Sequence, residues 1–202
     1  VVPTLAAAAR RAAELAGAAP DVPGDETPGS PADGHVRGLF SGGTLCSEAA
    51  AILAEELGSV ASNAPAGRAS GLTPGREPDG HVCLDLGEEE YTRGRPHPMI
   101  DPEARAEAIR ETGGNTAVGV LLFDVVLGYA SHGDPAGALL PAVTAAMAAN
   151  PSLRVVAYVL GTEEDPQVLS RQVAQLTGAG VTVAASNAEA ARLAARLVRD
   201  GG

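Results

Sequence analysis

The chain has 202 residues, 45% of them apolar and 19% charged, which is ordinary for a globular protein that builds one full core. Its formal net charge is −11 without any basic stripe, so neither nucleic acid nor a membrane surface is expected as a partner. All 14 basic residues are arginine, which excludes a Schiff-base or P-loop lysine. Cys46 and Cys83 alone make neither a disulfide framework nor a zinc site, and this favours a reducing cytoplasm.

The N-terminal part of the chain is predicted to lie outside the folded domain. Residues 1–17 favour a helix that ends at Gly17, and we interpret it as the tail of an upstream domain that this sequence lacks. An extra helix of the folded domain is the alternative interpretation. Residues 18–34 are rich in proline, glycine and acidic residues and predict a disordered linker. The folded domain is therefore expected over residues 35–198.

From residue 35 onward, short apolar segments alternate with helical patterns. Residues 116–128 are the most apolar and are β-branched, which predicts a buried central strand. Residues 58–79 lack periodicity and predict a long loop around a short edge strand. Three helices are expected to begin at Asp–Pro pairs, since aspartate caps a helix and proline suits its first turn. The predicted strands are 35–41, 81–87, 116–128, 153–161 and 181–186, and the Asp–Pro pairs are Asp101–Pro102, Asp134–Pro135 and Asp165–Pro166.

This alternation predicts a three-layer, doubly wound α/β domain of the flavodoxin-like type with a mostly parallel sheet. In such folds ligands bind outside the C-terminal ends of the strands. The first of these ends carries Ser41, Gly42, Gly43 and Thr44. Their main-chain N–H groups open a helix and suit a phosphate or a carboxylate. A tight turn that requires glycine is the alternative interpretation.

A second polar loop, residues 85–102, is also expected at this edge. His97 lies between two prolines, and such a rigid polar loop is more often functional than a plain connector. Arg93 and Arg95 suit bidentate binding of a carboxylate or phosphate. Alternatively, the two arginines balance the acidic run 88–90.

Further candidates lie at the ends of strands. His132 follows the most apolar strand, where a general base or a phosphorylated imidazole would lie, and a solvated loop histidine is the alternative. Asp85 and Asp124 either face a ligand or bond neighbouring loop amides. His35 and His81 begin strands at the opposite edge and are predicted to be structural. No metal site is expected, because no metal-ligand spacing appears.

Several segments together resemble the C-terminal part of FdrA-family proteins, which are relatives of the succinyl-CoA synthetase α subunit. The resemblance covers nearly all of residues 35–198, and its most specific piece is the run RPHPMID. The segments are FSGGTLCSEA (40–49), DLGEEEYTRGRPHPMIDP (85–102), GVLLFDVVLGYASHGDPA (119–136), VLGTEEDPQ (159–167) and AGVTVAASNAEAARLA (179–194).

The resemblance implies the ligase-CoA domain of an acyl-CoA synthetase that handles the acyl phosphate or thioester of a small acid. It implies no cofactor within this domain, CoA or a nucleotide bound through a missing N-terminal half, and assembly with that half and with other subunits. In succinyl-CoA synthetases the segment similar to 155–161 leads into a glycine-rich loop with a phosphorylated histidine. Here VLGTEEDPQ runs directly into the next helix, and His132 is the nearest candidate to replace that histidine.

Three alternatives remain open at this point. FdrA-type proteins have also been connected with carbamoyl transfer to oxamate in allantoin degradation, which needs no phosphohistidine. The 41–44 loop, Arg93, Arg95 and His97 would then hold carbamoyl phosphate and a small dicarbonyl anion. A non-catalytic assembly domain would also lack the histidine loop. A plain flavodoxin is disfavoured, because FMN sites usually stack aromatic rings on the flavin and only 2% of this chain is aromatic.

Overall fold

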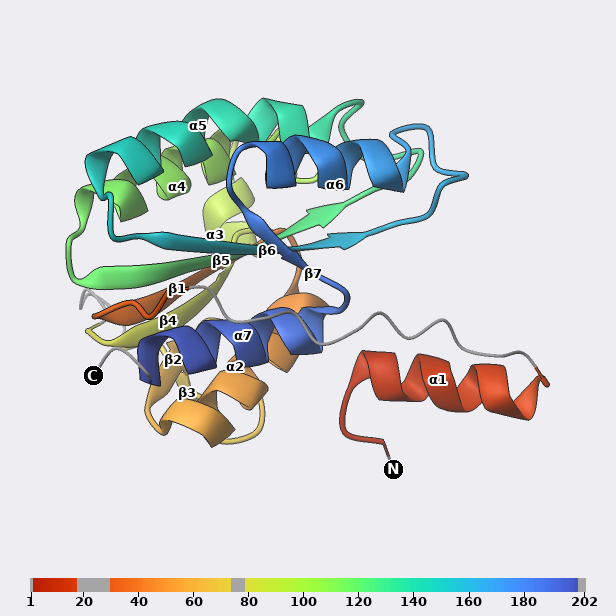
Figure 1. Ribbon diagram of the computed structural model, residues 1–202, viewed down its shortest axis with the longest axis horizontal. Coiled ribbons are helices and arrows are strands. Elements are labelled where there is room, and N and C mark those ends of the chain that lie inside the picture. The colour runs from red at the N-terminus through yellow and green to blue at the C-terminus, as the bar shows by residue number, and fades with distance from the viewer. Residues whose placement is uncertain (1, 18–29, 74–78, 200–202) are drawn as a thin grey trace.

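The computed structural model describes residues 2–17, 30–73 and 79–199, and most of these form a three-layer α/β domain (Figure 1). Its sheet has seven strands, all parallel, in the order β3-β2-β4-β1-β5-β6-β7. This confirms the predicted doubly wound, flavodoxin-like fold. The strands are β1 (His35–Phe40), β2 (Val60–Ser62), β3 (Ser70–Gly71), β4 (His81–Asp85), β5 (Val118–Val126), β6 (Arg154–Leu160) and β7 (Thr182–Ala184).

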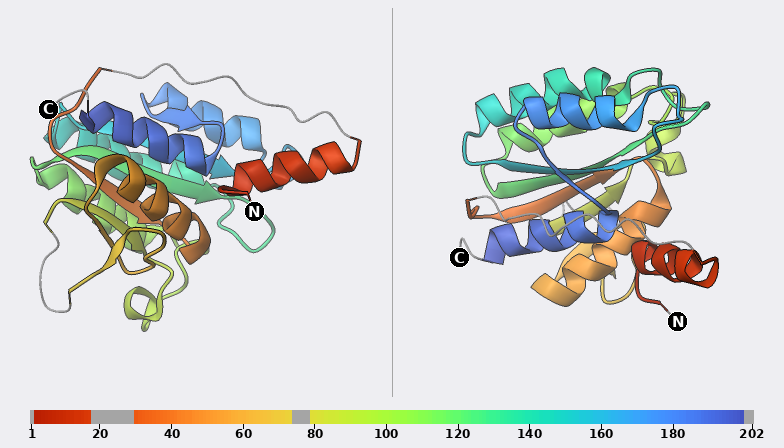
Figure 2. Two further views of the ribbon diagram at one scale, coloured as in Figure 1. Left: turned by 90° about the horizontal axis from the view of Figure 1, so that it is seen from below. Right: turned by 45° about the vertical axis from the view of Figure 1, so that its right-hand side comes forward.

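Helices cover both faces of the sheet. Figure 1 shows α4, α5 and α6 above the sheet and α2 and α7 below it, with the short α3 near the end of β4. The views in Figure 2 show α1 outside these layers, beside α2 and α7. The helices are α1 (Leu5–Leu15), α2 (Gly43–Leu57), α3 (Glu89–Thr92), α4 (Glu103–Gly114), α5 (Pro135–Ala149), α6 (Leu169–Gly178) and α7 (Asn187–Arg199).

The two faces of the sheet have separate apolar cores. Successive side chains of a strand point to opposite faces, so β5 contributes to both cores. Its residues Val120 and Leu122 pack with α2 and α7, whereas Leu121 and Phe123 pack with α4 and α5. Because both faces are covered, β5 is apolar along nearly its whole length, with Asp124 as its one charged residue, and this is the pattern that predicted a buried strand.

The order of the strands determines where a ligand can bind. β1 lies between β4 and β5, and the chain first adds strands on the β4 side and then crosses to the β5 side. The connection from β1 runs toward β2 and the connection from β5 runs toward β6, so the chain leaves these two neighbouring strands in opposite directions. The crevice between them opens at the C-terminal ends of the strands, where doubly wound folds bind ligands.

The predicted helix starts are only partly correct. α5 begins at Pro135 after Asp134, as predicted. α6 does not begin at Asp165–Pro166 but at Leu169, after Val168 in the left-handed region at φ 60°. The Asp165 carboxylate instead accepts a hydrogen bond from the N–H of Thr162 at 2.7 Å. The Asp165 carboxylate therefore stabilises a turn and does not cap a helix.

Parts of the N-terminal region pack against the domain. The helix predicted within residues 1–17 is α1, and its Leu5 N–H donates to Glu48 Oε1 at 2.6 Å. Residues 18–29 of the predicted linker lie outside the described residues. Within residues 30–34, Ala32 is buried and its N–H donates to the carbonyl of Leu197 at 2.9 Å.

Within the described residues, no helix is both long enough and apolar enough to cross a membrane. The two cysteines are free thiols buried in the core. Burial raises the pKa of Cys46 to about 12, so its thiol is an unreactive part of the packing.

The surroundings of His81 predict that folding stability depends on pH. Its Nδ1 accepts the N–H of Val36 at 3.0 Å, and its ring contacts the ring of His35 edge-on. Burial, and secondarily His35, lower the pKa of His81 below 6.5. The folded state thus binds its proton less readily than the unfolded state. The stability from neutral His81 is complete above about pH 6.5 and decreases as the pH falls through the lowered pKa.

We expect urea unfolding to show decreasing stability as the pH falls below about 6.5, and a smaller decrease in His81→Asn. The asparagine side chain does not titrate and retains an acceptor for the Val36 N–H. His35→Asn is the matched control, since His35 contributes only a secondary part of the shift. An equal decrease in His81→Asn and the unmodified chain would show that other groups cause the pH dependence.

Candidate functional site

The loop Ser41–Thr44 connects β1 to α2 at the crevice. Ser41 donates from its N–H to Asp124 Oδ1 at 2.9 Å and from its hydroxyl to Oδ2 at 2.8 Å. α2 begins at Gly43, and among the described residues no side chain caps it. The first N–H groups of a helix have no acceptor within the helix, so those of Gly43 and Thr44 can bind a ligand.

A buried ion pair holds this loop in place. Arg105 Nη2 lies 2.9 Å from Asp124 Oδ1, and the two side chains are only 3% and 1% exposed. The guanidinium also donates to the main-chain carbonyl of Asp124 and, at 3.4 Å, to that of Leu39. Burial lowers the pKa of Arg105, and the Asp124 carboxylate opposes this effect. Asp124, a predicted substrate-binding residue, thus contacts the loop amide and hydroxyl of Ser41.

His97 and Asp85 meet at Gly87, next to the same loop. A Cβ added to Gly87 would lie 2.5 Å from His97 Nε2, 2.8 Å from the Ser41 carbonyl oxygen and 3.0 Å from Asp85 Oδ1. A Cβ on Gly43 would lie 3.1 Å from Asp85 Oδ2. The imidazole and the carboxyl group therefore converge beside the start of α2, and glycine at position 87 leaves room for this approach.

Asp85 is a buried carboxyl group at this edge. Its carboxyl Oδ1 accepts the N–H of Gly87 at 2.8 Å, and it is 4% exposed. Burial raises the pKa of Asp85, and Glu88 adds to this, whereas the Gly87 N–H and His97 partly offset it. A carboxyl group with a raised pKa beside an imidazole can accept and return a proton.

The loops that carry His97 and His132 are bonded to each other. The N–H of His132 donates to the carbonyl of Met99 at 2.7 Å. The Nδ1 atom of each histidine accepts a main-chain N–H, from Met99 for His97 and from Asp134 for His132. In the neutral form each ring therefore carries its proton on Nε2. His97 is the one whose Nε2 is placed beside the Ser41–Thr44 loop.

Gln167, which the sequence analysis did not select, fixes the His132 loop. Its side chain is 2% exposed, and its Nε2 donates to the carbonyls of Gly128 at 2.8 Å and His132 at 3.0 Å. Its Oε1 accepts the N–H of Gly128 at 3.1 Å. Gln167 takes this position because α6 starts two residues later than the glutamine, at Leu169.

The two predicted arginines lie outside this cluster. Arg93 is 3.6 Å from Glu89, and both side chains are largely exposed. Arg95 Nη1 donates to Glu107 Oε2 at 3.2 Å. Each guanidinium therefore already has a carboxylate partner, consistent with the charge-balancing interpretation, and surface pairs of this kind are easily exchanged for a ligand.

The sequence analysis also missed Arg105. Arginine in a helix with a charged face predicts a solvated side chain. However, Arg105 lies four residues before the buried Ile109, on the same side of α4, and this spacing was the available signal. No sequence signal was available for Gly87, because its role is to leave room for the side chain of His97, ten residues later in the chain.

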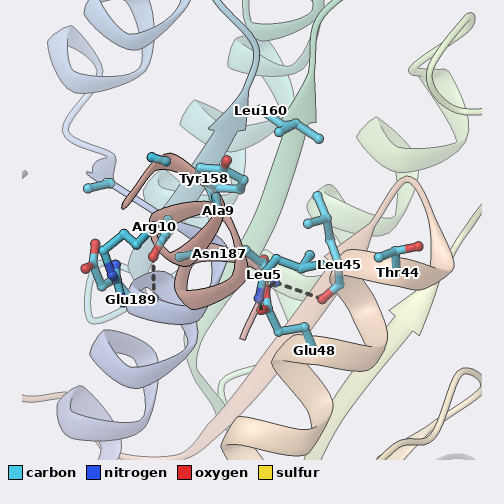
Figure 3. A pocket seen from close by; sticks show the side chains of 14 residues that line it. Leu5, Ala9, Arg10, Thr44, Leu45, Glu48, Tyr158, Leu160, Asn187 and Glu189 are labelled. Atoms are coloured by element: carbon cyan, nitrogen blue, oxygen red, sulfur yellow. Dashed lines mark hydrogen bonds between the residues drawn. The ribbon is translucent and has the colours of Figure 1, made fainter. Parts of the chain in front are cut away.

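An apolar cavity of about 690 Å³ lies next to the loop (Figure 3). α1 forms one wall, and the opposite walls come from the start of α2, the end of β6 and the turn before α7. Thr44 belongs both to this lining and to the Ser41–Thr44 loop. Figure 3 shows Tyr158, Leu45 and Leu5 around it, with Glu48 at its edge.

Among the described residues, no group of three or more histidine, cysteine or acidic side chains is placed to hold a metal ion. The start of α2 is thus an open helix N-terminus at the C-terminal edge of a doubly wound sheet, beside a buried carboxyl group and an imidazole, and such an arrangement can hold an anion. The family described as CoA-ligase matches residues 39–197, so this chain belongs to the CoA-ligase family.

A relative in Escherichia coli strain K12, the uncharacterized protein YahF, is 37% identical over 175 residues. The match covers 85% of this chain but only 34% of YahF. The chain thus spans about a third of the length of that relative.

We expect Asp124→Ala to destabilise the domain by about 3–5 kcal/mol, because it leaves the Arg105 charge buried without its partner. Asp124→Ala also removes the acceptor of both Ser41 donors. Urea unfolding measures the loss, and Arg105→Met alone and Asp124→Ala with Arg105→Met complete a double-mutant cycle. The double variant should recover much of the stability. A loss below about 1 kcal/mol in Asp124→Ala would contradict the central role of the ion pair.

Proposed function

We propose that this chain is the ligase-CoA domain of an FdrA-type, acyl-CoA synthetase-like enzyme, and that its Ser41–Thr44 loop holds the phosphate or carboxylate of the substrate. One observation carries this proposal: the uncapped start of α2 lies beside the convergence of His97 and Asp85. The positive end of the helix dipole and the free N–H groups favour an anion. The imidazole and the carboxyl group supply acid–base or nucleophilic chemistry at the same point.

The chemistry assigned to the cluster is phosphoryl transfer from an acyl phosphate. The Asp85 carboxylate first takes the proton from His97 Nε2, which frees the lone pair of that nitrogen. Nε2 then attacks phosphorus, and the bond from phosphorus to the acyl oxygen breaks to release the carboxylate. Nε2 is the available nitrogen because Nδ1 accepts the Met99 N–H. The raised pKa of Asp85 suits it to receive the proton. His97 thus replaces the histidine that the loop after β6 lacks.

Carbamoyl transfer is a second candidate function, and the loop after β6 favours it. This loop carries no histidine and is closed by the bonds of Asp165 and Glu163 to Thr162 and Ser170. Carbamoyl phosphate has the same anionic head as an acyl phosphate, so the Ser41–Thr44 loop would hold it equally well. In this alternative, His97 assists transfer to a carboxylate acceptor without being phosphorylated.

Replacing Thr44 by proline tests the anion site. Thr44→Pro removes one main-chain N–H within the first turn of α2, where proline is tolerated. Thr44→Ala retains that N–H and removes only the hydroxyl. By calorimetry, we expect Thr44→Pro to weaken binding of inorganic phosphate about tenfold or more, and Thr44→Ala to change it little. Equal affinities in the two variants would exclude the loop amides as ligands.

Labelling with ³²P tests the role of His97. Acetyl phosphate should leave an acid-labile phosphate on the chain and on His132→Asn, but not on His97→Asn. Label on His97→Asn would exclude His97 as the acceptor. Absence of label on the unmodified chain, with an increased melting temperature in carbamoyl phosphate, would favour carbamoyl transfer instead.

A further inference from the structure

The cavity beside the loop has the size and lining of a binding site for an apolar group. Its volume of about 690 Å³ lies within the range of roughly 300–1,000 Å³ that is usual for small-molecule sites. Leu5 and Ala9 of α1, Leu45 of α2, and Tyr158 and Leu160 of β6 line it. These groups come from three separate elements and leave the space between them open (Figure 3).

Large apolar side chains remain exposed at this cavity. Leu160 is 43% exposed and Leu5 is 48% exposed, although both line it. An apolar occupant would remove this surface from water, which is favourable in proportion to the area buried.

The charged lining residues disfavour an anionic tail. Glu48 and Glu189 line the cavity against a single cation, Arg10. Glu48 is fixed there, since its Oε1 accepts the Leu5 N–H at 2.6 Å and its Oε2 accepts Asn187 Nδ2 at 2.8 Å. A second carboxylate on a ligand would therefore face net negative charge in an otherwise apolar space.

The cavity and the anion site adjoin each other. Thr44 contributes its N–H to the start of α2 and also lines the cavity. A single molecule with an anionic head at the Ser41–Thr44 loop therefore meets the cavity with the part attached to that head.

From these features we propose that the cavity binds the aliphatic chain of an acyl substrate whose phosphate or carboxylate is held by the Ser41–Thr44 loop. The substrate class is thus the monocarboxylic acids with an apolar chain, rather than short dicarboxylic acids. This assignment rests on the proposed function, because it assumes that the Ser41–Thr44 loop holds the head group of the substrate. α1 forms one wall of the cavity and would therefore help to determine which chain fits.

A series of alkylphosphonates from methylphosphonate to hexylphosphonate tests this assignment by calorimetry on the full chain. These stable compounds carry a phosphate-like head and a tail of increasing length. Each added methylene should tighten the dissociation constant about fourfold once the tail enters the cavity. Propylphosphonate should bind about tenfold or more tightly than 3-phosphonopropionate, which has the same number of carbons and a carboxylate as a second anionic group.

Filling the cavity provides the matched control. Ala9→Phe places a ring against the lining of the cavity and should abolish the dependence on chain length while methylphosphonate binding is retained. Ala12→Phe makes the same substitution on the same helix at an exposed position outside the lining and should leave the series unchanged.

The outcomes separate this proposal from the proposed function. Methylphosphonate binding without dependence on chain length would overturn the cavity assignment alone, as would tighter binding of 3-phosphonopropionate than of propylphosphonate. A dependence on chain length that persists in Ala9→Phe would also overturn it. If methylphosphonate does not bind but 1-alkanols of the same lengths show the fourfold steps, the cavity stands and the anion site fails. No binding of either series would overturn both.

Discussion

The carboxylate of Asp124 is the constraint on which the edge of this domain depends. It is 0% exposed, and burial of a carboxylate is costly unless donors surround it. Those donors come from two other segments, the N–H and hydroxyl of Ser41 and the guanidinium of Arg105. The Asp124 carboxylate therefore has all of these donors only when β1, β5 and α4 are in their folded positions. The same bonds fix where the chain leaves β1 and thus where α2 begins.

Polar bonds of this kind, more than apolar packing, determine the shape of the site. Asn63 extends the pairing of β2 with β4 by accepting the Asp85 N–H and donating to its carbonyl, at 2.7 and 2.8 Å. Gln167 likewise clamps the loop after β5. Each side chain replaces a main-chain partner that a longer strand would have supplied. The loops at this edge are thereby held without a core of their own, which leaves their outer surfaces for a ligand.

The fold could be predicted from the sequence because it follows local patterns. The mostly apolar run of β5 and the Asp134–Pro135 pair each indicate an element without reference to the rest of the chain. The Asp165–Pro166 pair shows the same signal and a different outcome, since Asp165 binds the Thr162 N–H instead. A local signal specifies a capping residue but not which of two nearby N–H groups that residue will bind.

The contacts of the site were less predictable, because they join distant segments. Ser41 was found from its place after a strand, His97 from its two flanking prolines, and Asp124 from its charge at the end of an apolar strand. The sequence did not show which of these candidates contact one another. Gly87 matters only because it makes room for His97, and Arg105 only because it pairs with Asp124 on another element. For Arg93 and Arg95 the local sequence predicted anion binding. In the structure each of them instead pairs with a glutamate at the surface. Pairing across elements depends on strand order, which residue spacing does not encode.

Recognition of the head and the tail of a ligand would then rest on different parts of this molecule. The Ser41–Thr44 loop is held from within by the buried ion pair, so a change there disturbs the core as well as the site. α1 lies outside the three layers and contributes small alanine side chains to its wall of the cavity (Figure 2). Enlarging or shrinking a residue on that wall alters the space for a tail at little cost to the fold. If the two proposals hold, chain-length preference would vary through α1 while the Ser41–Thr44 loop and the neighbouring His97 stay unchanged.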